Sequence, residues 1–343
     1  MKHILPILAL VLAVSSVIIV TAGSDDSSAA ICDDVKVYIL NEDDSYTMST
    51  VNDVQTVRDA INKAMADQGK KLELNLTMTN ILSVDDRKPG DSQYWRVFQW
   101  LPAGTSGWGV QAFNQASNDR MMSGTTYCVT LSTITNVNGT NVYSEPNFKP
   151  VSTGYVFIRF ANGFSPDNEH VKAVFTPEIR SQGFWLKAEG STMGEVLKNA
   201  INANWPGEIE TFTGNDGMGN DVADWINRMF GLGNDNLGDN VWAYWNQFCW
   251  VDHQWSYNSW TLGYYDPAVY PYIECIYLLS TPDPYGDGYV VDKGGPEPNP
   301  DTDTIVPMKN VLTVDFKLPD GTVWKTQEVK YGQQANLSEI PEP

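Results

Sequence analysis

The chain has 343 residues, 42% of them hydrophobic, which is enough for ordinary buried cores and excludes a disordered chain. Its 42 Asp and Glu residues outnumber its 22 Lys and Arg residues, for a formal net charge of -20. Such a charge repels phosphate backbones and anionic lipid surfaces, so nucleic acid is disfavoured as a partner.

The N-terminus has the pattern of an export signal. Lys2 precedes an uncharged run of 17 residues, positions 4–20, and small residues follow it. Ala22 fits a cleavage site, whereas the length of the run is at the lower limit for a membrane span. We therefore expect an extracellular or cell-envelope protein in which residues 1–22 are a cleaved signal peptide or a retained anchor, with residues 4–20 as the membrane tether and residues 23–30 as a spacer.

Four cysteines lie outside the signal, and an even number in an exported protein favours disulfides. We predict that Cys32 pairs with Cys128 and Cys249 with Cys275, because each pair falls within one proposed domain. Buried free thiols are the alternative. The cysteines lack C-x-x-C spacing, which disfavours a thiolate metal site.

The first predicted domain, residues 31–150, combines short strands with one helix. Apolar residues at helical spacing between Asp53 and Met65 predict the helix, and Gly69 is placed to close it. Short runs rich in β-branched and aromatic residues predict the strands: Val35–Leu40, Tyr46–Val51, Leu72–Leu82, Tyr94–Leu101, Gly109–Phe113 and Tyr127–Ile134. One helix crossing a small mixed sheet is the simplest arrangement of these elements.

The second predicted domain, residues 151–281, repeats this order with insertions. Thr192–Ala203 reads as its helix, with Thr192 as N-cap and Glu195 completing a capping box. Asp221–Gly231 reads as an added short helix. Three strands are expected before the main helix: Tyr155–Ala161, Val171–Phe175 and Phe184–Ala188.

A Pro-, Gly- and Asp-rich linker, residues 282–307, precedes a short tail. In the tail, Val311–Leu318 and Thr322–Tyr331 alternate as strands around an Asp-Gly turn. We therefore expect a C-terminal β-hairpin module over residues 308–343.

An aromatic pattern, Y-W-x-x-F-x-W followed by a later Trp, occurs once in each domain. The first copy runs from Tyr94 to Trp108, and the second, from Tyr244 to Trp260, lies in a stretch that holds five of the twelve Trp. Most of these rings are expected in the core, because both faces of the predicted strand are apolar. The alternative is an exposed platform for a glycan or a surface protein, formed by Trp255, Tyr257, Trp260, Tyr264 and Tyr265.

The order of strand, strand, T-x-x-(D/E) helix, Y-W aromatic strand and closing strand resembles the β-grasp domain of unknown function related to the transcobalamin C-terminal domain. The resemblance covers residues 31–135 and 152–281 and implies an α+β fold with two tandem β-grasp-like domains. Residues 312–336, LTVDFKLPDGTVWKTQEVKYGQQAN, resemble the first part of the internalin B-repeat, also called the Listeria-Bacteroides repeat. That resemblance implies a cell-envelope setting and a partial β module.

Motifs for catalysis and metal binding are weak. His170 and His253 lack a motif that would make them catalytic, and G-x-S-x-G, H-E-x-x-H and phosphate-loop patterns are missing from the sequence. Oxygen-rich loops give weak calcium candidates, Asp235, Asp239 and Asp287, for which ordinary turn chemistry is the simpler explanation.

These patterns favour a non-enzymatic exported cell-surface protein without a cofactor, whose tandem modules bind a ligand or mediate adhesion. The rival interpretations are a secreted hydrolase acting on polysaccharide and a purely structural envelope module.

Overall fold

The computed structural model describes residues 31–102, 107–111, 113, 121–160, 169–216, 219–257, 261–282, 289–292, 297–309, 311–330 and 335–336. Strands account for 48% of the structure and helices for 15%, which confirms a mixed, strand-rich α+β chain. The chain divides into two compact units, residues 1–151 and 152–343. Among the described helices, none combines the length and the apolar character that crossing a membrane requires. The proposed tether, residues 4–20, lies outside the described residues.

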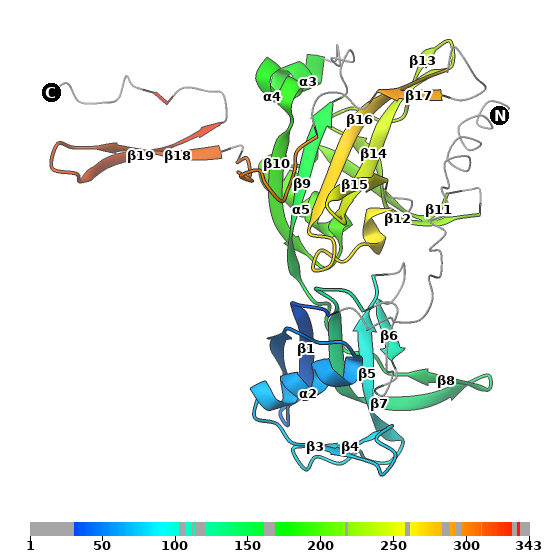
Figure 1. The fold of residues 1–343 in the computed structure, drawn as a ribbon. Coiled ribbons are helices and arrows are strands. Elements are labelled where there is room, and N and C mark those ends of the chain that lie inside the picture. The colour runs from blue at the N-terminus through cyan, green and yellow to red at the C-terminus, as the bar shows by residue number, and fades with distance from the viewer. Residues whose placement is uncertain are drawn as a thin grey trace. The chain divides into compact units, whose positions relative to one another are not determined.

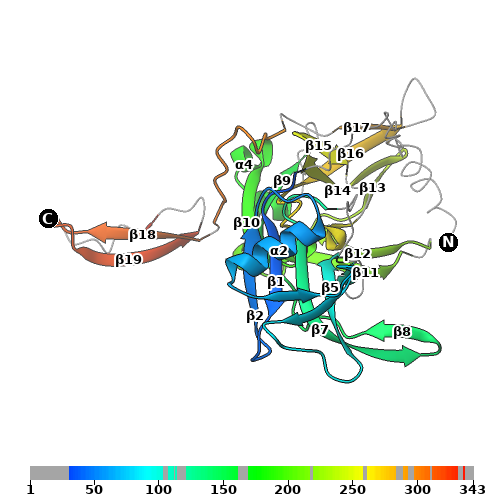
Figure 2. The ribbon, with the colours of Figure 1, turned by 60° about the horizontal axis from the view of Figure 1, so that its bottom comes forward.

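The first unit is built on one sheet in the order β2-β1-β7-β5-β6, with β8 paired to β7. β1 and β7 are parallel, whereas the other neighbouring pairs are antiparallel. Helix α2 lies across one face of this sheet, and a small hairpin, β3–β4, follows it (Figures 1 and 2). The elements are β1 Val35–Leu40, β2 Tyr46–Val51, α2 Val57–Asp67, β3 Leu72–Leu74, β4 Ile81–Val84, β5 Gln93–Trp100, β6 Trp108–Gln111, β7 Thr126–Val137 and β8 Thr140–Tyr143.

The second unit repeats the plan, with a sheet in the order β10-β9-β16-β14-β13. Strands β9 and β16 are parallel, as β1 and β7 are, and helix α5 packs on this sheet. A longer hairpin, β11–β12, follows α5 (Figure 1). The elements are β9 Ser152–Phe160, α3 Glu169–Val174, α4 Pro177–Gln182, β10 Phe184–Gly190, α5 Met193–Asn204, β11 Ile209–Asn215, β12 Asp221–Met229, β13 Asp235–Gly238, β14 Val241–Val251, β15 Gln254–Tyr257, η1 Leu262–Tyr264, β16 Tyr272–Pro282 and β17 Tyr289–Asp292.

The two main helices begin in the same way. The Thr56 side chain accepts a hydrogen bond from the amide of Asp59, and Thr192 accepts one from the amide of Glu195. Both acidic residues lie in the first turn, where they complement the helix dipole. The Glu195 carboxylate reaches back past the cap and accepts from the backbone N–H of Ser191 at 2.9 Å.

Three predicted elements are wrong. The strand expected over Leu72–Leu82 is instead the hairpin of β3 and β4, with residues 75–80 outside both strands. Val171–Phe175 lies in and just after helix α3, where the buried Val171 and Phe175 are four residues apart on one helical face. The predicted helix at Asp221–Gly231 is instead strand β12, whose buried Val222, Ile226 and Met229 imitate helical spacing. Register shifts against β11 produce this imitation, because each bulge adds a residue to the ordinary alternation of a strand.

The C-terminal segment forms the expected hairpin, with β18 Val311–Lys317 paired to β19 Val323–Lys330. The preceding stretch is not a free linker throughout. Strand β17 extends the second sheet through β16, and the amide of Met308 donates to the Trp185 carbonyl on β10 at 2.7 Å.

Candidate functional site

The duplicated aromatic strands are β5 and β14, which occupy the same place in their sheets. Trp95 and Trp245 point to the helix-covered side, and each is only 5% exposed. The Trp95 indole N–H donates to the Arg87 carbonyl at 3.1 Å, and that of Trp245 donates to the Leu232 carbonyl at 3.0 Å. The first Trp of each motif is therefore a core anchor with a satisfied indole, as expected for buried Trp.

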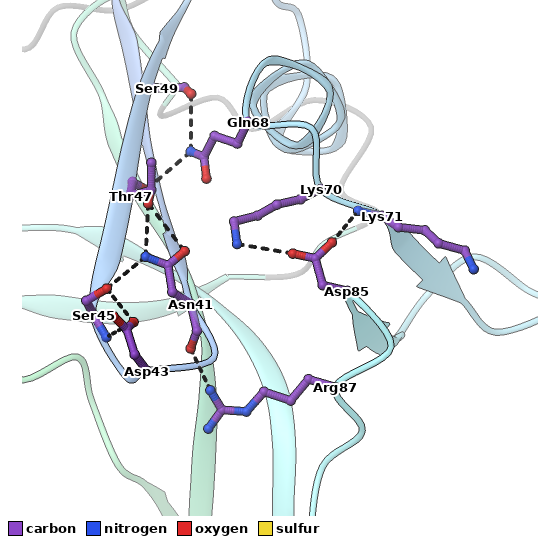
Figure 3. Close-up of polar contacts among 10 residues, drawn as sticks. All are labelled: Asn41, Asp43, Ser45, Thr47, Ser49, Gln68, Lys70, Lys71, Asp85 and Arg87. Atoms are coloured by element: carbon purple, nitrogen blue, oxygen red, sulfur yellow. Dashed lines mark hydrogen bonds and ion pairs between the residues drawn. The ribbon is translucent and has the colours of Figure 1, made fainter.

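In the first unit a polar network holds the segment that accepts the Trp95 bond (Figure 3). Arg87 donates through Nη1 to the Asn41 carbonyl at 2.6 Å, and Asp85 accepts from Lys70 Nζ at 3.2 Å. Gln68 donates through Nε2 to the Thr47 carbonyl at 3.2 Å. These bonds join the β1–β2 turn, the end of α2 and the chain after β4, so the network is structural.

The second Trp of each motif makes a matching pair on the neighbouring hairpin strand. Trp100 lies opposite Trp108 with ring centroids 5.3 Å apart at 69°, and Trp250 lies opposite Trp255 at 5.2 Å and 68°. The counterpart of Trp108 is therefore Trp255, which corrects the pairing with Trp260 that the sequence pattern indicated. Trp260 itself lies outside the described residues.

In each unit, the segment that follows the last strand of the sheet packs against the Trp pair. We call residues 144–150 strap 1 and residues 297–303 strap 2. The Trp108 indole donates to the Phe148 carbonyl in strap 1 at 2.8 Å, and the Trp255 indole donates to the Pro298 carbonyl in strap 2 at 2.6 Å. Both straps contain the tripeptide Glu-Pro-Asn, at 145–147 and 297–299, which marks the two straps in the sequence. The carbonyl that accepts the indole bond follows the tripeptide in strap 1 and belongs to its Pro in strap 2.

Strap 1 is held by the aromatic ring of Phe148, which we call the aromatic plug. The half-buried Phe148 ring lies 4.8 Å from Tyr38, 4.7 Å from Tyr46 and 5.5 Å from Trp108, measured between ring centroids. Rings at these separations gain both buried apolar area and favourable edge contacts.

Strap 2 is fixed by charge and hydrogen bonds. Asp301 accepts from the Trp250 indole at 3.1 Å, and its other carboxylate oxygen lies 2.6 Å from Nδ1 of His253. The bond to Asp301 raises the pKa of His253, and the same bond lowers the pKa of Asp301. Both side chains remain well exposed, so water and salt weaken the pair.

Beneath strap 2, an ion pair lies inside the sheet. Arg159 on β9 donates through Nε to Glu274 on β16 at 2.5 Å, with the two side chains 4% and 0% exposed. A second guanidinium nitrogen lies 3.3 Å from Glu297 at the start of strap 2. The Arg159 guanidinium therefore bridges the buried Glu274 of the sheet and the partly exposed Glu297 of strap 2, which ties the strap to the sheet.

The predicted binding platform is not assembled as one surface. Trp255 and Tyr257 lie on β15, and Trp255 is engaged with strap 2. Tyr264 donates its hydroxyl to the Asp221 carbonyl at 2.9 Å, and the Tyr265 ring packs on Tyr270 at 5.0 Å. Tyr257, 48% exposed, keeps a large free surface, although its ring edge meets Phe248 at 5.9 Å. The described members of this set mostly support the protein's own fold.

The predicted disulfides are absent, since Cys32, Cys128, Cys249 and Cys275 are all buried free thiols in the structure. Cys32 packs in the cluster under α2 and Cys128 in the cluster on the opposite face of the sheet, so those two cannot pair. Cys249 and Cys275 lie on adjacent strands, but each faces a different cross-strand partner, Ile273 and Gln247. Burial raises the pKa of the thiols of Cys128, Cys249 and Cys275, which disfavours reactive thiolates.

Neither the calcium candidates nor the histidines form a metal site among the residues that the structure describes, which contain no group of three or more metal-binding side chains. Asp235 instead accepts the Tyr277 hydroxyl at 2.6 Å, and Asp239 lies in the turn before β14 with φ 50°. Asp287 lies outside the described residues.

No protein-family model matches this chain, and a search of the curated proteins finds no match.

Proposed function

We propose that the chain is an exported, non-enzymatic surface protein built from two tandem β-grasp domains, followed by a partial B-repeat-like β module. The β-grasp assignment is supported by the strand order and directions that both sheets share, in which the first and last main strands are parallel neighbours and one helix packs across the sheet. The exported location is supported by the apolar run at residues 4–20 behind Lys2.

The observation that carries the proposal is an arrangement present in both units, which we call the clamp: a Trp pair whose indole N–H donates to a strap carbonyl. In each, a Trp pair on the sheet holds the strap that leads on to the next part of the chain. Docking of a strap on its sheet orders part of the segment that joins one folded part of the chain to the next, and so reduces the conformational entropy of that segment. This arrangement suits a module that displays a binding surface at a defined distance from a cell envelope.

Protease accessibility on intact cells tests the location. The full chain carries a C-terminal epitope tag and is expressed in its own host, and intact cells are treated with protease. We expect loss of the tag from intact cells while a cytoplasmic marker survives. Mass spectrometry of the mature N-terminus then distinguishes cleavage after Ala22 from retention of residues 4–20. A tag that is lost only after lysis would contradict the proposal.

A further inference from the structure

An exposed aromatic pair lies on the β11–β12 hairpin of the second unit. Phe212 and Trp225 are directly opposite each other across the two strands, so their side chains share one face. They are 45% and 43% exposed, although large rings of this kind are usually covered. Adjacent exposed rings on one face of a hairpin are a typical sign of a binding surface.

The backbone beneath this pair is held from several sides. Asp224, next to Trp225, adopts the left-handed conformation with φ 55° and is buried, with its carboxylate 2.6 Å from Lys198 Nζ on α5. A Cβ at Gly194 would lie 2.2 Å from that carboxylate, so helix and bulge are in close contact. The Ala223 amide donates to Thr261 Oγ1 at 2.7 Å. The rings are therefore mounted on a fixed support, as binding sites require.

A polar cavity lies at the base of this hairpin, between it and α3. It has a volume of about 200 Å³ and is lined by His170, Gly207, Glu208, Glu210, Arg228 and Gly231. Glu210 lies opposite Arg228 and two residues before Phe212. The register shift between Glu210 and Thr211 adds its extra residue on β12, so β11 keeps its alternation and the exposed Glu210 and Phe212 share one face. Neither Glu210 nor Arg228 makes a side-chain hydrogen bond or ion pair to another residue that the structure describes. Their polar groups can therefore bind a ligand without breaking an existing contact.

We propose that the Phe212–Trp225 pair and this cavity form a binding site for a neutral glycan. The rings offer flat apolar faces to the C–H side of a sugar, while the Glu210 carboxylate accepts hydrogen bonds from hydroxyls and the Arg228 guanidinium donates them. The Glu208 carboxylate is already bound to His170 Nε2 at 2.9 Å. The volume is below that of a pocket for a drug-sized molecule and suits a single sugar residue, with the rings contacting a neighbouring one. A chain with a net charge of -20 disfavours acidic sugars.

This inference deepens the proposed function by naming the ligand class of a surface module. Binding by the purified chain does not depend on where the cell places the protein. The binding experiment and the protease experiment therefore fail independently, and a cytoplasmic protein that still bound the glycan would remove the surface role alone.

The test uses the purified full chain on an array of neutral and acidic glycans, followed by titration of the strongest neutral oligosaccharide. We expect Trp225→Ala and Phe212→Ala each to weaken binding about tenfold or more, and Glu210→Gln with Arg228→Met to weaken it further. Trp324→Ala is the matched control, because Trp324 is 41% exposed on β19, which belongs to a different two-stranded sheet from the β11–β12 hairpin, and its loss is expected to leave binding unchanged.

Circular dichroism and urea unfolding of each variant show whether the fold is intact, and both aromatic variants alter exposed side chains. No binding of any neutral glycan by the wild-type chain would overturn the proposal, as would preference for acidic glycans. Unchanged affinity in the folded Trp225→Ala and Phe212→Ala proteins would remove the site. Binding lost in Trp255→Ala alone would return the site to the β15 hairpin.

Discussion

Strap 1 is held by the ring of Phe148 among three aromatic side chains, whereas strap 2 is held by the pair between His253 and Asp301. The clamp itself is the same in both units, because a Trp pair and an indole hydrogen bond are present in each. The Trp pair, which both units share, thus determines where the strap lies. The Phe148 ring in one unit and the His253–Asp301 pair in the other determine which conditions release the strap.

The two sheets also differ, because the second has buried charges where the first has uncharged side chains. Glu274 and Cys128 occupy corresponding positions, since each lies opposite the Phe of its aromatic motif. On the parallel neighbouring strands, Glu274 pairs with Phe157 and Cys128 pairs with Tyr38. Two residues further along these strands lie Arg159 and Leu40, which therefore correspond. The second unit therefore has a buried ion pair where the first has a thiol and an apolar side chain, and the comparison predicts different vulnerabilities.

The largest expected effect is from Glu274→Ala. Removing this carboxylate leaves the buried Arg159 guanidinium without its closest partner, so we expect a loss of about 3–5 kcal/mol in the free energy of unfolding. Urea unfolding followed by Trp fluorescence measures it.

The control for this prediction replaces both partners. Arg159→Leu with Glu274→Leu makes the second sheet resemble the first, and we expect the double variant to recover most of the loss, because apolar side chains of similar size often replace a buried ion pair without cost. A double variant as unstable as Glu274→Ala would show that packing, not the unpaired charge, causes the effect.

A smaller effect is expected from Phe148→Ala. The ring is half-buried and contacts three others, so its loss is expected to cost about 1–2 kcal/mol and to expose strap 1 to protease. Unfolding in urea and the rate of cleavage within residues 144–150 are the measurements. Pro300→Ala, at the matching place after Glu-Pro-Asn in strap 2, is the control and should change cleavage of strap 2 less. Equal sensitivity of the two straps would contradict an aromatic plug confined to the first unit.

The sequence predicts much of the architecture, because the spacing of apolar residues within one segment is enough to indicate a strand or a helix. The strands at Val35–Leu40 and Tyr46–Val51 and the N-cap at Thr192 are confirmed, and so is the alternation that places Trp245 and Phe248 on opposite faces. The β12 strand is not predictable in this way, because bulges give Val222 and Ile226 a helical spacing.

The candidate sites were harder to predict. A Trp-rich stretch looks the same in sequence whether its rings face solvent or receive the protein's own chain, and the docking of Trp255 on Pro298 joins residues 43 positions apart. Phe212 and Trp225 become neighbours only through the pairing of β11 with β12. Both features depend on contacts between segments, which periodicity within one segment does not contain.

The smallest expected effect is the response of strap 2 to pH. The pKa of His253 is raised when strap 2 is docked, so its contribution is complete below the ordinary pKa of about 6.5 and is lost as pH rises through the raised value. The pKa of Asp301 is lowered, so its contribution is present above the ordinary pKa of about 3.9 and is lost as pH falls through the lowered value. Docking should therefore be tightest between about pH 4 and 6.5 and should weaken in alkaline solution, with Asp252 beside His253 adding to the same trend.

Cleavage within residues 297–303, divided by cleavage of strap 1 in the same sample, cancels the pH dependence of the protease itself. The ratio should rise between pH 6 and 9 in the wild type and stay flat in Asp301→Asn, and NMR titration of His253 should show a lower pKa in that variant. High salt should reduce the wild-type response, because both side chains are exposed. A ratio that remained constant with pH in the wild type would mean that the Trp250 and Trp255 indoles hold strap 2 without help from the ion pair, and the two straps would then differ in composition but not in the conditions that release them.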